Sequence, residues 1–235
     1  MQVGITLPSF QPTGAALLET AREAERVGID GVFAFDHLWP GRQKSRPALS
    51  LYPVLGAVMA ATQHIRVGSL VARIGLVPDR VVISSFISLL EMGGHRLVAA
   101  LGVGDSKSMA ENKAFGIEWL PIEDRRRSLA VVLDALGGEA IECWVGANAT
   151  ATLDIARAAG VAVNLWDVEL DRLRAEARLG ATTWAGSLPT DAPSAARRLV
   201  ELRDAGAEWV IWGWPRSTDL VVRALSLAGM RGSRG

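Results

Sequence analysis

The sequence has little of several residue types on which particular kinds of chemistry depend. It contains one cysteine, Cys143, so a disulfide framework and a cysteine-rich metal cluster are excluded. Its three histidines are scattered, and neither H-x-H nor H-E-x-x-H occurs, so no metal site is expected. There is no G-x-S-x-G pattern, which argues against a hydrolase with a nucleophile elbow. Cys143 lies in an apolar run and is interpreted as an inert core residue.

The chain also lacks an excess of either charge and any long hydrophobic run. Lysine plus arginine and aspartate plus glutamate number 25 each, so neither a nucleic acid nor a membrane surface is favoured as a partner. The basic run at 125–127 is interpreted as the solvated start of a helix. No apolar stretch reaches the roughly 18 residues of a membrane span, and residues 1–5 do not have the pattern of a signal peptide. We therefore expect a cytoplasmic protein with a small-molecule partner.

What the chain does contain is a regular alternation of short apolar runs and helical stretches. The apolar runs are near-continuous, as in a parallel sheet that helices cover. Eight repeats in 235 residues predict a compact (β/α)8 TIM barrel, a single domain over 1–230 with a tail at 231–235. An open doubly wound sheet is the alternative, weakened because no G-x-G-x-x-G follows the first strand. The predicted strands are 2–7, 31–35, 65–71, 96–101, 141–145, 161–166, 181–186 and 209–213.

Helices are predicted between these strands from apolar spacing and from glycines that follow. Leu17, Ala21 and Ala24 share one face of the first helix. Gly137 and Gly138 are predicted to end the helix that begins near residue 122. Residues 105–116 are polar and are expected to form a loop with a short helix. The predicted helices are 15–27, 51–63, 78–92, 122–136, 150–159, 169–178, 192–205 and 218–228.

Asp36 and His37 follow the second strand, at the end of a parallel barrel where chemistry takes place. A histidine can accept or donate a proton near neutral pH, so His37 is a candidate acid or base. Asp36 could anchor a hydroxyl or amide group of a ligand. The alternative is that His37 only caps the junction of strand and loop. His64 and His95 lie away from such strand ends and are interpreted as structural.

Two segments could bind an anion. Residues 146–150 run from a strand into a helix, where free N–H groups and small side chains suit a phosphate. An ordinary N-cap by Asn148 or Thr150 is the alternative. The segment Arg216-Ser217-Thr218 enters the last helix and offers a second anion site. Spacing alone does not choose between the two.

Eight tryptophans are many for a chain of this length. Trp39 and Trp214 lie at strand ends, where they could form the wall of a site for a flat aromatic ligand. Trp119 lies in a predicted loop. The others lie in or beside strands and are expected in the core: Trp144, Trp166, Trp184, Trp209 and Trp212.

The order of several motifs resembles the bacterial luciferase-like monooxygenases, a family that includes deazaflavin-dependent oxidoreductases. Residues 1–8 resemble its first strand, and residues 24–38 resemble its AE-x-x-G(F/Y)D segment with the DH that follows. Residues 65–69 resemble its third strand. Residues 94–105 resemble its GGR and LGxG motifs. Glu111 and the Phe115-Gly116 pair match the acidic residue and the FG that come next.

The resemblance implies a TIM barrel that holds coenzyme F420 or FMN at its C-terminal mouth. The family's Asp-His pair corresponds to Asp36, which would orient the ring, and His37, which would work near the reacting carbon. The implied catalytic residues are therefore His37 and Asp36. The implied cofactor-binding residues are Asp36, the bulge residues Val71, Ala72 and Arg73 behind the ring, the LGxG residues Gly102 and Gly104, and the phosphate segment Gly146, Ala147, Asn148, Ala149 and Thr150. This alignment favours the 146–150 segment over Arg216.

The chain also departs from the family. Members usually carry insertions between strands four and five and around strand seven, whereas residues 136–141 pass almost directly into a strand. The lid and much of the substrate pocket are therefore expected to be missing. Ala147 replaces a glycine of the phosphate motif. Asp105 and Lys107 occupy the place where sugar-phosphate-oxidising members carry a glutamate, so that acid role is not assigned.

The leading hypothesis is an F420- or FMN-dependent oxidoreductase of the luciferase-like type, acting by hydride transfer or monooxygenation on an unknown small organic substrate. The alternative is a non-catalytic flavin-binding barrel, because a barrel without insertions could hold a cofactor and yet have no substrate pocket. A third hypothesis is a sugar-phosphate or amino-acid-pathway isomerase that uses residues 216–218 as a phosphate clamp. A homodimer is compatible with the apolar helix face at 51–59.

Overall fold

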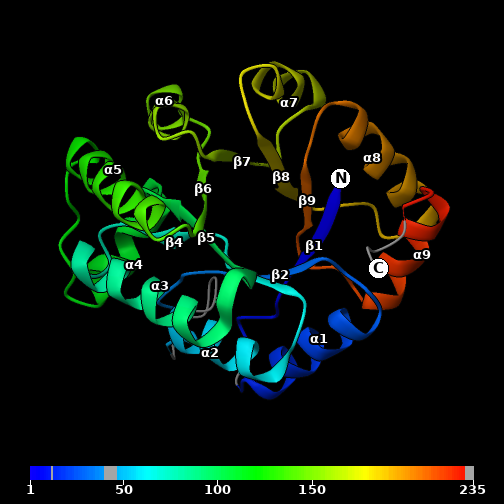
Figure 1. The fold of residues 1–235 in the computed structure, drawn as a ribbon, viewed down its shortest axis with the longest axis horizontal. Coiled ribbons are helices and arrows are strands. Elements are labelled where there is room, and N and C mark those ends of the chain that lie inside the picture. The colour runs from blue at the N-terminus through cyan, green and yellow to red at the C-terminus, as the bar shows by residue number, and fades with distance from the viewer. Residues whose placement is uncertain (12, 40–46, 231–235) are drawn as a thin grey trace.

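The computed structural model describes residues 1–11, 13–39 and 47–230, and in them a closed parallel barrel (Figure 1). Neighbouring strands run in the order β3-β2-β1-β9-β8-β7-β6-β5, and β3 also pairs with β5, which closes the ring. Every pairing is parallel, so the C-terminal ends of the strands meet at one mouth. The predicted (β/α)8 barrel is confirmed. The strands are β1 Gln2–Thr6, β2 Gly31–Ala34, β3 Arg66–Ser69, β4 Ala72–Arg73, β5 Leu97–Gly102, β6 Glu142–Gly146, β7 Ala162–Trp166, β8 Thr182–Gly186 and β9 Trp209–Trp212.

The third strand of the barrel is interrupted near the mouth. The sequence predicts one strand over 65–71, but β3 ends at Ser69, and the Leu70–Val71 peptide bond is cis. The chain then pairs again as the short strand β4, where Arg73 lies opposite Gly102 of β5. This interruption falls at the place predicted for the bulge.

Helices surround the barrel on its outside (Figure 1). Most of their bounds lie within two residues of the predicted ones, and residues 105–116 form a loop with a short helix, as predicted. One prediction is wrong: Gly137 and Gly138 lie inside α5, and Ala140, with a φ of 56°, takes the left-handed conformation after it. The helices are α1 Ala15–Arg26, α2 Leu51–Ala61, α3 Asp79–Gly93, η1 Gly94–Arg96, η2 Ser106–Ser108, α4 Met109–Ala114, α5 Ile122–Gly138, α6 Thr150–Ala158, α7 Leu170–Ala177, α8 Ala192–Asp204 and α9 Thr218–Leu227.

Two groups of apolar side chains hold the barrel together. The larger packs between the strands and the helices, and the smaller fills the inside of the barrel around Phe33, Trp144 and Trp209. Glycines make room for the Phe33 ring, because a Cβ at Gly4 or Gly68 would lie 2.7 or 2.8 Å from it. Four tryptophans predicted for the core are buried there: Trp144, Trp184, Trp209 and Trp212.

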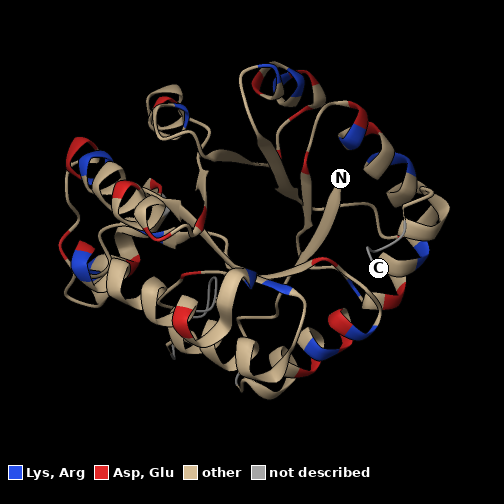
Figure 2. Ribbon diagram, in the orientation of Figure 1, with Lys and Arg blue, Asp and Glu red and all other residues tan. Residues whose placement is uncertain are grey.

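Charged residues lie mainly on the outer helices (Figure 2). The basic run at 125–127 is only partly solvated, however. Arg127 is exposed, as predicted, and it pairs with Asp124, but Arg125 is buried, with its guanidinium 4.0 Å from the centre of the Trp119 ring. Arg125 donates to the carbonyl oxygens of residues 103, 104 and 120, so it fastens the loop after β5 to α5. The periodicity of α5 turns Arg125 toward the barrel.

No helix in the described part of the chain is long and apolar enough to cross a membrane. The predicted tail at 231–235 lies outside the described residues.

Candidate functional site

A cavity of about 940 Å³ opens at the C-terminal mouth of the barrel. Its lining comes from residues at or beyond the ends of β1, β2, β3, β4, β5, β6, β7 and β9. This is the end at which parallel barrels carry their sites. The volume suits a cofactor ring together with a small ligand. The expectation that shortened insertions leave little pocket is therefore not met.

Asp36 and His37 both line this cavity, just beyond the end of β2. The strand carries them there because its parallel pairing with β1 and β3 directs its C-terminal end to the mouth. The His37 side chain is 40% exposed, and its ring meets Phe10 edge-on, with centroids 5.7 Å apart. His37 is therefore accessible from the cavity and also held by packing. Neither His64 nor His95 lines it, and both are exposed.

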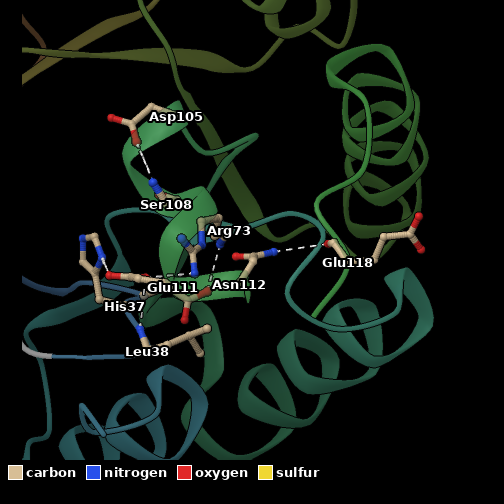
Figure 3. Close-up of polar contacts among 9 residues, drawn as sticks. His37, Leu38, Arg73, Asp105, Ser108, Glu111, Asn112 and Glu118 are labelled. Atoms are coloured by element: carbon tan, nitrogen blue, oxygen red, sulfur yellow. Dashed lines mark hydrogen bonds and ion pairs between the residues drawn. The ribbon is translucent and has the colours of Figure 1, made fainter. Parts of the chain in front are cut away.

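Glu111, on α4, is the main residue of this site to which the sequence assigned no role. Its carboxylate is buried, and its Oε1 lies 2.9 Å from Nδ1 of His37 (Figure 3). Its Oε2 accepts the backbone N–H of Leu38 at 3.3 Å. The signal was present in the sequence, since Glu111 matches the acidic residue of the family pattern. Its position gave no hint of the partner, because 74 residues separate it from His37.

Arg73 joins the two carboxyl groups of the site. Its backbone N–H donates to Oδ2 of Asp36 at 2.9 Å. Its Nη2 lies 3.1 Å from Oε2 of Glu111 (Figure 3). The residue is 6% exposed. Within the described part of the chain, none of its three side-chain nitrogens makes a hydrogen bond of good geometry. The guanidinium thus balances the Glu111 charge through proximity.

The two carboxyl groups have pKa values moved in opposite directions. Burial raises the pKa of Asp36, and the Arg73 N–H with the charges of Arg73 and His37 offset this only in part. Burial also acts to raise the pKa of Glu111, but the His37 hydrogen bond and charge, the Leu38 N–H and the Arg73 charge outweigh it and lower that pKa. An ionised carboxylate only accepts hydrogen bonds, so Nδ1 of His37 is the nitrogen that donates to Glu111, which leaves Nε2 to face other partners.

The predicted phosphate segment also borders the cavity. Gly146, Ala147, Asn148 and Ala149 line it, whereas Thr150 does not and is exposed. The N-cap of α6 is Ala149, and no side chain caps the helix, so the alternative of a cap by Asn148 or Thr150 is wrong. The first N–H groups of α6 are therefore without a side-chain acceptor beside the cavity.

Arg126 lines the cavity at this same end. Its Nε donates to Oγ1 of Thr152 on α6 at 3.2 Å, and its Nη1 donates to Glu123 at 2.8 Å. The sequence interpretation of Arg126 as a solvated residue is corrected here, since its side chain is 18% exposed. It lies at the mouth because it is one residue beyond buried Arg125 on α5.

Three predicted cofactor residues divide between the lining and the layer behind it. Val71 lines the cavity, but Ala72 and Gly102 do not. Gly102 has a supporting part, because a Cβ there would lie 2.5 Å from Cγ2 of Val71. A Cβ at Gly146 would lie 2.5 Å from Cγ1 of the same side chain. Two glycines on neighbouring strands therefore form the recess that holds Val71.

The remaining glycine of the predicted set, Gly104, lines the cavity with a φ of 68°. That left-handed conformation suits glycine. A Cβ there would also lie 3.1 Å from Cδ of Arg73. Gly104 thus allows the Arg73 side chain to lie against the backbone of the loop after β5.

Aromatic side chains form one wall of the cavity. Trp39 and Trp214 both line it, as their places at strand ends suggested. Trp166 lines it too and is only partly buried, which corrects its assignment to the core. As the last residue of β7 it lies at the mouth rather than inside the barrel. Phe10 and Phe35 complete the wall.

The second anion segment is not part of this cavity. Arg216 does not line it, and the Ser217 hydroxyl accepts the N–H of Leu220 as the N-cap of α9. The isomerase hypothesis, which needed these residues as a phosphate clamp, loses its basis.

Cys143 is buried, and burial raises the pKa of its thiol to about 12, so it stays a neutral thiol. Among the described residues, no group of three or more His, Cys, Asp or Glu is placed to hold a metal ion.

The profile of the luciferase-like monooxygenase family matches residues 1–138, more than half of the chain. The chain belongs to this family, which confirms the resemblance read from its motifs.

Two curated proteins that are similar to this chain are named F420-dependent glucose-6-phosphate dehydrogenases. An F420-dependent glucose-6-phosphate dehydrogenase of Nakamurella multipartita is 34% identical over 143 residues, or 60% of this chain and 39% of the relative. Its counterpart from Beutenbergia cavernae is 32% identical over 50% of this chain and 36% of the relative. The matched region thus spans less than two fifths of the length of either relative.

Solved structures show the same fold. An F420-dependent secondary alcohol dehydrogenase in complex with an F420-acetone adduct has a TM-score of 0.75 at 14% identity, covering 95% of this chain and 96% of that one. The monooxygenase RslO1 from Streptomyces bottropensis has a TM-score of 0.70 at 15% identity, covering 96% and 99%. At these identities the likeness concerns the fold.

Proposed function

We propose that this protein is an oxidoreductase that binds coenzyme F420, or FMN, in the mouth cavity and oxidises or reduces a small organic substrate. Family membership and the names of the F420-dependent relatives support this proposal. The observation that carries it is the His37–Glu111 hydrogen bond in the cavity, which orients a proton acceptor beside space for a ligand. The non-catalytic alternative was based on a missing pocket, and the 940 Å³ cavity removes that motive.

The residues of the cavity fit such a cofactor in shape and charge. Gly102 and Gly146 draw the Val71 side chain into a recess that a Cβ on either glycine would fill. This leaves a smooth apolar surface that suits one face of a flat ring. At the α6 end, uncapped helix N–H groups and Arg126 are suited to a phosphate group. We assign the ring to the Val71 surface and the phosphate to residues 146–149.

The chemistry that F420 or FMN supplies when bound is the acceptance or donation of a hydride. The part of this chain is to move the accompanying proton. With Nδ1–H donated to Glu111, Nε2 of His37 accepts the proton of a substrate hydroxyl as the substrate gives up its hydride. In the reverse direction, protonated His37 returns that proton to the carbonyl oxygen. Glu111 is a positioning residue, because it fixes the tautomer of the histidine.

Asp36 is assigned to binding and orientation. Its Oδ2 accepts the Arg73 N–H, so the carboxyl group is held at the edge of the cavity. Because its pKa is raised by burial, Asp36 holds a proton more readily than an exposed aspartate does. A protonated carboxyl group can both donate and accept a hydrogen bond. It therefore suits the polar edge of a ring system that carries carbonyl and N–H groups.

The proposal is tested by titrating the purified protein with F420 and, separately, with FMN. Quenching of tryptophan fluorescence reports binding, because Trp39, Trp166 and Trp214 line the cavity. We expect saturable binding of at least one cofactor, and weaker binding of riboflavin, which lacks the phosphate, than of FMN. Circular dichroism confirms that the sample is folded. A folded protein that binds neither cofactor would contradict the proposal.

A further inference from the structure

The aromatic wall of the cavity is continuous. Phe35 stacks on Phe10 with ring centroids 5.8 Å apart, and it stacks on Trp214 at 5.2 Å. Trp166 meets Trp214 edge-on at 5.5 Å. The wall reaches the proposed proton acceptor, because Phe10 contacts the ring of His37 at 5.7 Å. These four rings, Phe10, Phe35, Trp166 and Trp214, are here called the aromatic wall; Trp39, which contacts Phe115, lines the cavity apart from it.

Trp214 is the most exposed residue of this wall. The residue is 52% exposed, although tryptophan has one of the largest apolar side chains. Its backbone has a φ of 47°, a left-handed conformation that is costly for a bulky residue. The Trp214 N–H donates to Oγ1 of Thr6 at 2.8 Å, which holds this conformation in place. An exposed indole contributes little to the stability of the fold. A ligand that covers it would gain binding free energy.

We propose that the substrate carries an aromatic or similarly flat apolar ring, which packs against Trp214 and Phe10 and places its alcohol or carbonyl group next to His37. This inference deepens the proposed function and rests on it, since the reacting group is the one that His37 serves. Aromatic pairs prefer centroid distances of about 4.5–7 Å, so a ring seated on Trp214 continues the stacking already present in the wall.

The charges of the cavity favour an uncharged ring over a phosphorylated sugar at this place. Two described arginines line the cavity, and both have partners: Arg73 lies beside Glu111, and Arg126 donates to Glu123 and Thr152. Arg126 also lies at the α6 end, where the cofactor phosphate is assigned. The aromatic wall, in contrast, is built from apolar rings. A substrate that matches the wall therefore gains by removing apolar surface from water.

The test compares ligands with one reacting group and different bodies: benzyl alcohol, cyclohexylmethanol, ethanol and glucose 6-phosphate. Binding to the cofactor-loaded protein is measured by saturation-transfer NMR and by thermal shift, so that turnover is not needed. We expect benzyl alcohol to bind most tightly. Trp214→Ala should weaken its binding by about tenfold, whereas Trp214→Phe should keep most of it. Leu227→Ala, an exposed apolar residue on α9 outside the cavity lining, is the control and should change nothing.

The outcomes separate this inference from the proposed function. If F420 or FMN binds to Trp214→Ala as tightly as to the wild-type protein, the aromatic wall is assigned to the substrate. Equal loss of cofactor and benzyl alcohol binding in Trp214→Ala would assign the wall to the cofactor and overturn the inference. Tighter binding of glucose 6-phosphate than of benzyl alcohol would overturn it as well. A wild-type protein that binds no cofactor would refute the proposed function itself.

Discussion

The guanidinium of Arg73 lies 3.1 Å from the carboxylate of Glu111, and both side chains are about as buried as the barrel core. The two come from different elements, β4 and α4, so the pair exists only when the short helix packs over the mouth. The hydrogen bond and charge of His37, together with the Leu38 N–H and the Arg73 charge, lower the pKa of Glu111, whose carboxylate in turn orients the ring of His37. Arg73 thus bears through Glu111 on His37, the residue proposed to transfer the proton.

Replacing His37 should separate binding from turnover. In His37→Ala we expect F420 or FMN binding within about twofold of wild type, since the ring and phosphate assignments do not use this side chain. Turnover should fall by about 100-fold or more, the usual contribution of a general acid or base. Steady-state kinetics measures the turnover, with a ligand from the binding test above that the wild-type enzyme turns over. His95→Ala, exposed and outside the cavity, is the matched control, and an active His37→Ala enzyme would disprove the role.

Replacing Glu111 should reduce stability in a pH-dependent way. Glu111→Gln leaves Arg73 buried without its counter-charge, so the free energy of unfolding at pH 7 should fall by about 3 kcal/mol. Because the folded-state pKa is lowered from 4.5, the stabilisation by Glu111 is present above that value and is lost as pH falls through the folded-state pKa. Urea denaturation at pH 7, 5 and 3.5 measures the difference, which should shrink at the lowest pH.

The control for that experiment is Glu201→Gln, which removes an exposed ion pair with Arg198. Such pairs contribute little, so the change should stay below about 1 kcal/mol at every pH. A Glu111→Gln protein as stable as wild type at pH 7 would show that the buried pair does not stabilise the fold. The same variant should also lower turnover, because the tautomer of His37 is no longer set by a carboxylate.

Replacing Asp36 should have the opposite effect on stability. Burial raises its pKa, so the folded state loses stability as pH rises from the unfolded value near 3.8 through the folded-state pKa. Asp36→Asn removes this penalty and keeps an acceptor for the Arg73 N–H. We expect it to be more stable than wild type at pH 7 and equally stable below pH 3.8. Cofactor affinity should change little, because an amide also donates and accepts hydrogen bonds. A variant that is less stable than wild type at pH 7 would contradict the raised pKa of Asp36.

The recess around Val71 can be filled by one carbon atom. In Gly146→Ala the new Cβ would lie 2.5 Å from Val71, which we expect to lower stability by about 1–3 kcal/mol and to weaken cofactor binding. Adding Val71→Ala should restore part of both, since the clashing methyl group is removed. Gly180→Ala, where a Cβ would meet no atom within 4 Å, is the control. If Val71→Ala restores neither stability nor cofactor binding, the clash with Val71 is not the cause of the losses in Gly146→Ala.

Much of the fold could be predicted from the sequence, because its signals are local. Eight apolar runs separated by helical stretches require eight strands covered by helices, and the parallel barrel satisfies that order. Glycine signals were less reliable: Gly137 and Gly138 continue α5, since packing of the helix on the barrel outweighs the cost of two glycines. The family could also be recognised, because its motifs are short and follow one another in order.

The tertiary structure decided what those local signals left open. The sequence by itself determined the barrel, the position of Asp36 and His37 at its mouth, and the loop that enters α6. It did not determine that Glu111 and Arg73 meet His37 and Asp36, that Arg125 turns inward, or that Trp166 joins the aromatic wall. Each of these depends on contacts between residues distant in the chain, which arise only when the ring of strands closes and brings all of its loops to one end.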